Sequence, residues 1–234
     1  MNKSVFDWQE ISFVVFDVDG TLYNQKLMRF RMLREMVNYS FCHFDILFFK
    51  ILKKYRELRE EIGEAEAESF EAVLVDRTAK ATGVDQEVIR ATVIEWMEKR
   101  PLRHIRACRY AAVDEVFAAL RRRGKIIGVF SDYPAAEKLA AMGLRADHVI
   151  AAGDHDVGIL KPHPRGLDVL MQRAGMTPEQ TILIGDRPER DGEAARRAGV
   201  AALIRSDKPI AGWTVFSRFS DPLFAPLLKA NDQA

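Results

Sequence analysis

The chain has 234 residues, which is more than one ordinary domain of roughly 100–200 residues and fewer than two. Hydrophobic residues make up 48% and charged residues 29%, so a sizeable core can form and disorder is not expected. The 35 basic and 34 acidic residues leave a net charge of +1, which argues against a nucleic-acid partner. Two cysteines are too few for a disulfide framework, and no signal peptide or apolar run of about 20 residues is seen. We therefore expect a cytoplasmic protein with no nucleic-acid or membrane partner.

The first predicted element is a strand over residues 11–16, where the run ISFVVF is apolar on both faces and ends at Asp17. No proline occurs between Thr21 and Pro101, and strand signals are absent from about residue 25 to residue 100. Apolar residues recur there at helical spacing, for example along 41–55, which we assign to one helix. This segment predicts an insertion of about 80 residues built as a four-helix bundle.

After Pro101 strands and helices alternate, which predicts βαβ units and a parallel sheet with helices on both faces. The predicted strands cover 125–130, 148–151, 181–185 and 200–204, and the predicted helices cover 111–123, 135–142, 164–174 and 193–198. The tail allows a last short strand and a helix near 221–228. The fold class is thus α/β and Rossmann-like, with an α/β domain over 1–22 and 105–234 and a helical domain over 23–104.

Three polar residues directly follow or end predicted strands, namely Asp17, Ser131 and Asp186. In open parallel sheets, ligands bind outside the carboxyl ends of the strands. The topology therefore predicts that these three residues converge on one site.

The acids at this sheet edge come in pairs, Asp17 with Asp19 and Asp186 with Asp191. An ionised carboxylate can act as a nucleophile or bind a hard cation, and crowding of acids raises the pKa of one of them, which suits it to proton transfer. Four converging carboxylates imply a divalent cation such as Mg²⁺. Each pair alone has a plainer interpretation, a capped turn or calcium-loop fragment for the first and a helix cap for the second.

Two further residues suit an anionic ligand. Ser131 and the N–H groups after it can bind an anion at a helix N-terminus, although serine is also a common helix cap. Lys161 lies in LKPHP, where Pro162 and Pro164 fix its loop, so its ammonium can offset phosphate charge. A lone lysine is otherwise usually solvated surface.

In combination and in this order, the sequence resembles the haloacid dehalogenase-like (HAD) hydrolase superfamily. DVDGT at 17–21 resembles motif I, VFSD ending at Asp132 resembles motif II, KPHP at Lys161 resembles motif III and GDRPERD resembles motif IV. The helical insertion is similar to the C1-type cap of the phosphoglycolate phosphatase and β-phosphoglucomutase branch. Asp132 and His163 depart from the commoner residues at their positions, without removing a core chemical role.

The resemblance implies a role for each motif residue. Asp17 would attack phosphorus and form an aspartyl phosphate, and Asp19 would protonate the leaving group and then activate water. Ser131, Lys161 and the backbone N–H of Asp132 would hold the phosphoryl oxygens. The ligands of Mg²⁺ would be Asp17, the backbone carbonyl of Asp19, and Asp186, with Asp191 acting directly or from behind them.

The resulting expectation is a Mg²⁺-dependent phosphatase of a small soluble phosphorylated metabolite, either monomeric or a homodimer. A phosphomutase of the β-phosphoglucomutase type is the first alternative, and a non-catalytic binding or regulatory protein is the second. Dehalogenation is not expected, because true haloacid dehalogenases lack the second acid, Asp19.

The predicted cap carries uneven charge. Lys26, Arg29, Arg31 and Arg34 form an acid-free cluster, from which Arg29 and Arg31 are candidates to bind a second anionic group of the substrate, although a solvated helix face is the plainer interpretation. The acidic run Glu60–Glu71 is expected to be solvated surface. Three phenylalanines and their neighbours are expected in the bundle core, namely Phe41, Phe44, Phe48, Cys42 and His43.

Overall fold

A computed structural model describes residues 6–43 and 46–229. Its centre is a six-stranded sheet in the order β3-β2-β1-β4-β5-β6, in which all neighbouring strands are parallel. The strands are β1 (Phe13–Phe16), β2 (Ile126–Ser131), β3 (His148–Ala151), β4 (Thr181–Gly185), β5 (Ala201–Arg205) and β6 (Thr214–Phe216). The predicted α/β fold is confirmed, including the short last strand.

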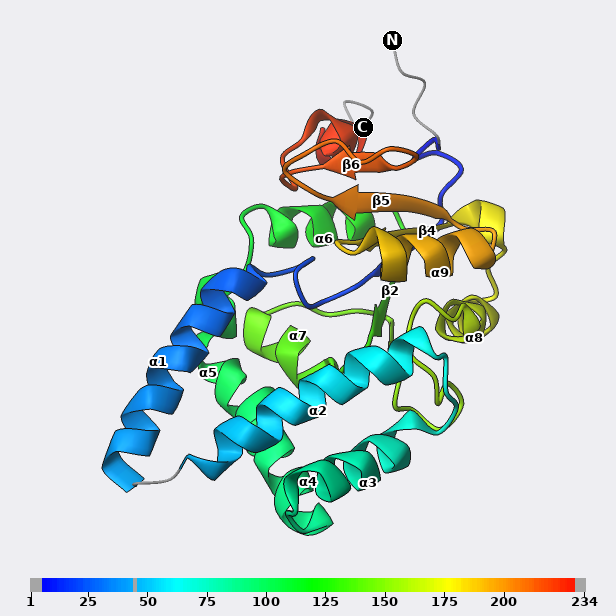
Figure 1. The fold of residues 1–234 in the computed structure, drawn as a ribbon. Helices are drawn as coiled ribbons and strands as arrows, with labels where there is room; N and C mark the ends of the chain where they lie inside the picture. The colour runs from blue at the N-terminus through cyan, green and yellow to red at the C-terminus, as the bar shows by residue number, and fades with distance from the viewer. Residues whose placement is uncertain (1–5, 44–45, 230–234) are drawn as a thin grey trace.

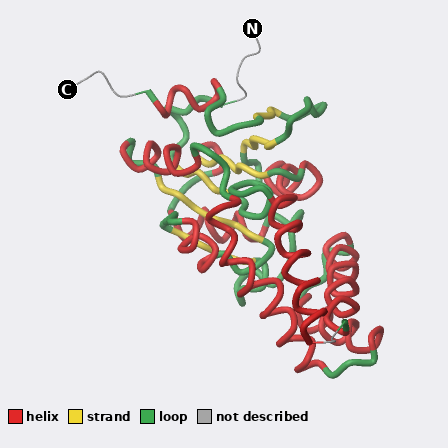
Figure 2. The backbone as a smooth tube through the Cα atoms, turned by 90° about the vertical axis from the view of Figure 1, so that its left-hand side faces the viewer, coloured by secondary structure: helices red, strands yellow, loops and turns green. Residues whose placement is uncertain are grey.

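Helices cover both faces of this sheet (Figure 2). Because side chains alternate along a strand, neighbouring residues of β1 and β2 pack against different helices. On one face Phe16 packs against Phe117 of α6 (Val113–Arg122), with ring centroids 4.7 Å apart. On the other face Phe130 fills the space left by Gly166 of α8 (Arg165–Ala174). The remaining helices of this part are α7 (Ala136–Met142), α9 (Glu193–Arg197) and α10 (Ala225–Leu228).

The predicted helical insertion lies between β1 and α6, and Figure 1 shows its helices grouped to one side of the sheet. It consists of α1 (Gln25–His43), α2 (Leu47–Glu64), α3 (Phe70–Thr82), α4 (Gln86–Val93), the π-helical segment η1 (Ile94–Lys99) and α5 (Arg100–Cys108). The last three run on without a break, so the insertion has four helical rods, as predicted. Among the described residues, no helix is long and apolar enough to cross a membrane.

The assignment of 41–55 to one helix is wrong, because α1 ends at His43 and α2 begins at Leu47. Phe48 is buried as predicted, but Phe41 is 83% exposed and Phe44 lies outside the described residues. Cys42 and His43 are exposed as well, so the prediction that they pack in the core is also wrong. Helical spacing can continue in phase from one helix into the next, and it does not show which face meets a partner.

The helix does not end at Pro101 but continues to Cys108, past the predicted domain boundary. Pro101 lies in the first turn of α5, directly after the π-helical segment, where a missing N–H costs little. The two chain segments that join the insertion to the sheet then pair with each other. Asn24 N–H donates to the Cys108 carbonyl at 2.9 Å, and Tyr110 N–H donates to the Leu22 carbonyl at 3.1 Å.

Candidate active site

The site lies at the carboxyl edge of the three central strands. Asp17 follows β1, Ser131 ends β2 and Asp186 follows β4, and β1 lies between the other two. The N–H of Asp17 donates to the Ile184 carbonyl at 2.9 Å, which extends the ladder between β1 and β4 as far as the site. The predicted convergence at this edge is therefore what the topology produces.

Lys161 is the central cation of the site. Its Nζ lies 2.7 Å from Asp17 Oδ1 and 2.6 Å from Asp191 Oδ1, and its side chain is only 2% exposed. Burial alone would lower the pKa of Lys161, but the two carboxylates outweigh it and raise that pKa well above its ordinary value. Lys161 is thus a fixed positive charge beside Asp17.

Both oxygens of Asp17 have a partner. Lys161 holds Oδ1, and the Thr21 hydroxyl donates to Oδ2 at 2.9 Å. Burial raises the pKa of the Asp17 carboxyl well above its ordinary value despite Lys161, with Asp191 and Asp186 adding to the rise. The contacts with Lys161 and Thr21 hold the Asp17 carboxyl group in one rotational position at the end of β1. Thr21 belongs to the DVDGT run, but no role was predicted for it.

Asp19 is held by two residues that the sequence analysis missed. Lys138 Nζ lies 2.7 Å from both carboxylate oxygens, and the Tyr23 hydroxyl donates to Oδ1. Burial would raise the pKa of Asp19, but Lys138 and Tyr23 together bring it below its ordinary value. Lys138 lies on α7, where nothing in the sequence distinguishes it from a surface lysine.

Three carboxylates lie close enough to share a metal ion. Oxygen atoms of Asp17, Asp186 and Asp191 lie within 4.8 Å of one another. Asp191 Oδ2 accepts the N–H groups of Asp186 at 3.2 Å and Arg187 at 3.0 Å, which leaves its other oxygen to Lys161. Asp186 Oδ1 is buried without a hydrogen-bond partner, and burial together with Asp191 raises its pKa to about 7.

These residues fit a hard divalent cation. Its preferred ligands are oxygens, and the orphaned Asp186 Oδ1 is an oxygen that a cation would satisfy. Charge points the same way, because two lysines, Lys138 and Lys161, face the four carboxylates of the predicted site.

Ser131, which ends β2, and Asp132, which follows it, lie close to Lys161 in the site. Ser131 is fully buried, and its Oγ accepts the N–H of Tyr133 at 3.2 Å. Asp132 Oδ1 accepts the Lys161 N–H at 3.3 Å, and the Asp132 carbonyl accepts a hydrogen bond from Arg59 of α2. Arg59 thus reaches from the insertion to the phosphate-binding segment predicted at Ser131 and Asp132.

A cavity of about 900 Å³ lies between the insertion and the sheet edge. Asp17, Asp19, Lys161 and the acidic pair near β4 line its floor. Of the two predicted cap residues, Arg29 lines this cavity. Arg31 instead lines a separate surface groove formed by α1 and α5.

Known proteins resemble this chain in sequence over most of its length. The haloacid dehalogenase-like hydrolase family matches residues 11–199. A glyceraldehyde 3-phosphate phosphatase of Methanopyrus kandleri is 26% identical over 208 residues, covering 85% of each chain. A phosphoglycolate phosphatase of Rhodospirillum rubrum is 26% identical over 215 residues, covering 89% of this chain and 86% of that one.

Solved structures share the fold. A 2-haloacid dehalogenase from Pseudomonas syringae superposes with a TM-score of 0.64 at 18% identity, covering 93% of this chain and 97% of that one. A predicted phosphoglycolate phosphatase from Haemophilus somnus gives 0.59 at 21% identity, covering 93% and 98%. Because both dehalogenases and phosphatases have this fold, the choice of reaction depends on the residues of the site.

Proposed function

Because the chain belongs to the haloacid dehalogenase-like hydrolase family, we propose that it is a Mg²⁺-dependent phosphatase that hydrolyses a phosphomonoester of a small metabolite through an aspartyl phosphate. The observation that carries the proposal is the arrangement of two acids: a buried Asp17 held by Lys161 and Thr21, beside an Asp19 held by Lys138 and Tyr23. The phosphatase names of the curated relatives support the same reaction class.

In the first step, an oxygen of Asp17 attacks phosphorus and the bond to the substrate's alcohol oxygen breaks. The departing oxygen takes a proton from Asp19. Asp19 is ionised in the substrate-free site, but a phosphate dianion beside it adds like charge and raises the pKa of its carboxyl, so Asp19 takes up a proton from solvent as the substrate binds. Lys161 offsets the charge on the phosphoryl oxygens, together with the hydroxyl of Ser131 and the backbone N–H of Asp132.

In the second step, water attacks the phosphorus of the aspartyl phosphate. Asp19, now ionised, takes the proton from that water, and Asp17 leaves as a free carboxylate. The products are the alcohol and inorganic phosphate. Asp19 returns its proton to solvent as phosphate leaves, which restores the ionised acid of the substrate-free site.

The metal ligands would be the carboxylates of Asp17, Asp186 and Asp191 and the backbone carbonyl of Asp19. When bound, Mg²⁺ would supply charge neutralisation to the phosphoryl oxygens and to the crowded acids.

The chain's division is proposed along the same lines. The α/β domain, 1–22 and 105–234, would provide the chemistry, and the cap, 23–104, would cover it and select the leaving group. We propose a cytoplasmic location, with which the free cysteines Cys42 and Cys108 agree, and a monomer or homodimer as the working form.

The test is Asp17→Asn, assayed as Mg²⁺-dependent phosphate release from an aryl phosphate. We expect kcat to fall by about 1,000-fold or more, since the nucleophile is removed. Asp76→Asn, which changes a half-buried acid of α3 that is paired with Lys80 and lies outside the cavity, is the matched control and should retain activity. Unchanged turnover in Asp17→Asn would overturn the assignment. Stoichiometric phosphate release without a bisphosphate activator would exclude the phosphomutase alternative.

A further inference from the structure

The cavity above the proposed site is much larger than a phosphate group requires and has two chemically different walls. The floor is formed by the acids and Lys161, whereas the wall contributed by the insertion combines a group of apolar residues with charged residues of α1 and α2. The apolar part of that wall comes from α1, α2, η1 and the start of α5, and its members are Met28, Met32, Leu33, Met36, Phe49, Leu52, Trp96, Met97 and Pro101. At about 900 Å³ the cavity is at the upper end of the range for small-molecule sites.

Methionine is concentrated in this wall. Met28, Met32 and Met36 follow one another at intervals of four along α1, so they form a ridge on one face of the helix. With Met97 they account for four of the chain's eight methionines. Flexible, polarisable thioethers suit contact with aromatic or irregular apolar groups.

Trp96 gives the wall one rigid surface. Its ring stacks on Phe48 at a centroid distance of 4.5 Å and 6° between planes, and the guanidinium of Arg100 lies 4.0 Å from its centre. Phe48 and Arg100 thus cover the ring, and a ligand meets only the part of Trp96 that lines the cavity. Because that side chain is already fixed, little rotamer freedom is lost on binding.

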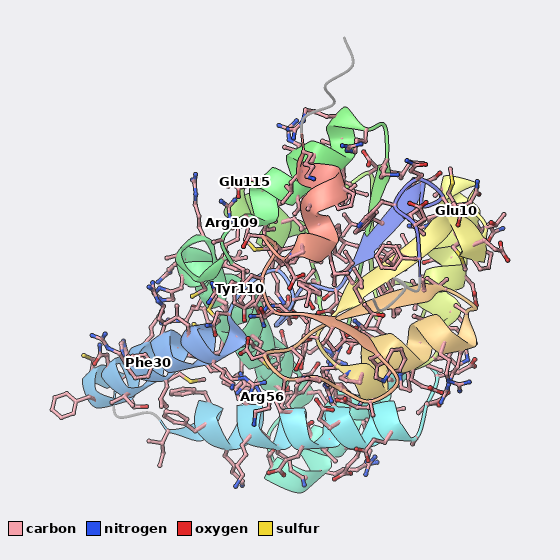
Figure 3. All side chains as sticks on the ribbon, turned by 90° about the horizontal axis from the view of Figure 1, so that it is seen from above. Glu10, Phe30, Arg56, Arg109, Tyr110 and Glu115 are labelled. Atoms are coloured by element: carbon pink, nitrogen blue, oxygen red, sulfur yellow. The ribbon has the colours of Figure 1, made fainter. Side chains whose placement is uncertain are left out.

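Three arginines at the cavity have no carboxylate ion pair among the described residues, namely Arg29, Arg56 and Arg59. Arg59 is instead engaged by the Asp132 carbonyl and by the rings of Phe70 and Tyr133. Of the neighbouring charges, Lys53 has Glu57 at 4.0 Å, and Glu60 is engaged by Arg187 and Arg190. Arg29 donates only to Gln25, at 2.9 Å, and Arg56 has no ion pair. Figure 3 shows Arg56 on α2, along the edge of that helix that faces α1.

The positive charges of Arg29 and Arg56 also repel each other. Burial lowers the pKa of the Arg56 guanidinium, Tyr133 opposes part of that effect, and the like charge of Arg29 adds to it. An oxyanion placed beside Arg56 would relieve this repulsion and receive paired N–H donors in a planar fork.

We infer that the preferred substrate is a phosphomonoester whose leaving group is a bulky aromatic or apolar alcohol bearing its own oxyanion, with the apolar body against the methionine ridge and Trp96 and the oxyanion at Arg56. The inference rests on the proposed phosphatase function and narrows its substrate class. A three-carbon phosphate would leave most of the methionine wall uncovered.

The test measures kcat and KM for four phosphates: ethyl phosphate, phenyl phosphate, 4-carboxyphenyl phosphate and 1,4-phenylene bisphosphate. We expect the KM for phenyl phosphate to be about tenfold or more below that for ethyl phosphate, because the ring buries several additional carbons, whereas the better leaving group of phenyl phosphate acts on kcat. The para oxyanion should lower KM by about another tenfold, and the better of the last two compounds identifies it as carboxylate or phosphate. Equal KM values for ethyl and phenyl phosphate, or no gain from either oxyanion, would overturn the inference.

Variants separate the two parts of the wall. Arg56→Gln should reduce the kcat/KM ratio of 4-carboxyphenyl to phenyl phosphate by about tenfold. Arg90→Gln, an exposed arginine of α4 outside the cavity, is the matched control and should leave the ratio unchanged. Leu33→Ser, at a cavity residue that is 52% exposed and so outside the core, should reduce the kcat/KM ratio of phenyl to ethyl phosphate.

Failure of the inference and failure of the proposed function give different results. If the function fails, no phosphate is released in an Asp17-dependent manner from any of the four compounds. The inference is then still measurable as the affinity of Asp17→Asn for 4-carboxyphenyl phosphate against ethyl phosphate, by calorimetry with Mg²⁺ present. Equal affinities there would overturn it, whereas retained hydrolysis with no selectivity would overturn it alone.

Discussion

The Asp19 carboxylate is held chiefly by one cation, because Lys138 Nζ lies 2.7 Å from both of its oxygens. Lys138 and Asp19 are both largely buried, with side-chain exposures of 6% and 14%. A buried carboxylate that loses its cation is left with an uncompensated charge. Lys138 is therefore a positioning residue for the proposed acid and base.

Lys138→Met keeps the length of the side chain and removes the charge. We expect kcat to fall by about 100-fold, the scale of a misplaced general acid, with the fold retained. Lys80→Met, on the exposed side of α3, is the matched control. Phosphate release at saturating Mg²⁺ and the circular dichroism spectrum are the measurements, and an active, folded Lys138→Met protein would contradict the positioning role.

Gly20 makes room for the proposed metal ligand Asp186. A Cβ at position 20 would lie 2.1 Å from Asp186 Oδ2, and the backbone there has a φ of +100°. Gly20→Ala should therefore displace Asp186 and lower Mg²⁺ affinity by about 10- to 100-fold. Gly124→Ala is the control, because its φ is also positive, at +65°, but nothing lies within 4 Å. It should cost some stability and leave Mg²⁺ affinity, measured by calorimetry, unchanged.

The site residues that are easiest to predict from the sequence are those that end a strand or follow it directly. The positions of Asp17, Ser131 and Asp186 follow from the parallel topology alone. Lys138, Tyr23 and Arg59 reach the site from helices or loops, and their approach depends on how those elements pack. No local pattern records that packing, so these partners were missed.

Among the elements, α1 and α5 are joined by a charged cluster at Glu35. Its carboxylate lies 2.9 Å from Arg100 and 2.9 Å from His104, and Arg103 is 3.6 Å away. Burial would raise the pKa of Glu35, but the hydrogen bonds from His104 and Arg100 bring it below its ordinary value. The cluster therefore links the first and last helices of the insertion.

Glu35→Gln should lower the free energy of unfolding by about 1 kcal/mol at pH 7. A lowered folded-state pKa means that the stabilisation is fully present above the unfolded value near 4.3 and is lost as the pH falls through the folded value. The difference between wild type and variant should thus shrink as the pH falls from 7 toward 3, in urea titrations. Glu64→Gln, an exposed position on α2, should show no such trend.

Element boundaries followed the sequence closely in the sheet and less closely in the insertion. Buried parallel strands read as short apolar runs, so β2, β4 and β5 were predicted to within about one residue. The division between α1 and α2 and the continuation through Pro101 depend on helix–helix packing and on a π-helical segment, which periodicity does not reveal.

For the whole molecule, the ion pairs between the insertion and the α/β part all have the same polarity within residues 6–43 and 46–229. The insertion contributes glutamates and the α/β part contributes arginines: Glu60 with Arg187 and Arg190, Glu66 with Arg197, and Glu68 with Arg165. The run Glu60–Glu71 is mostly exposed, as predicted, but three of its acids face these core arginines. Because the acids all lie on the insertion and the arginines all lie on the α/β part, these ion pairs favour the closed arrangement, in which the insertion covers the sheet edge.

Closure should therefore weaken with salt, because the screening length falls from about 10 Å at 0.1 M to about 3 Å at 1 M. We expect amide hydrogen exchange across residues 186–199 to be several times faster in 1 M NaCl, measured by mass spectrometry. A variant with Glu60, Glu66 and Glu68 all changed to Gln should exchange rapidly at both salt concentrations. If amide exchange in the wild type does not depend on salt concentration, apolar packing alone holds the insertion against the α/β part.

The position of β1 in the middle of the sheet also determines when the site can assemble during protein synthesis. β1 pairs only with β2 and β4 among the described strands, and two groups close to Asp17, Lys161 and Asp191, lie far along the chain. Ribosomes add about 5–20 residues per second, so the 174 positions from Asp17 to Asp191 take roughly 10 to 35 seconds to appear. Until then the proposed nucleophile lacks Asp191, and for most of that time it also lacks Lys161 and the neighbouring strands β2 and β4. The catalytic centre can therefore assemble only after Asp191 has been made, long after Asp17.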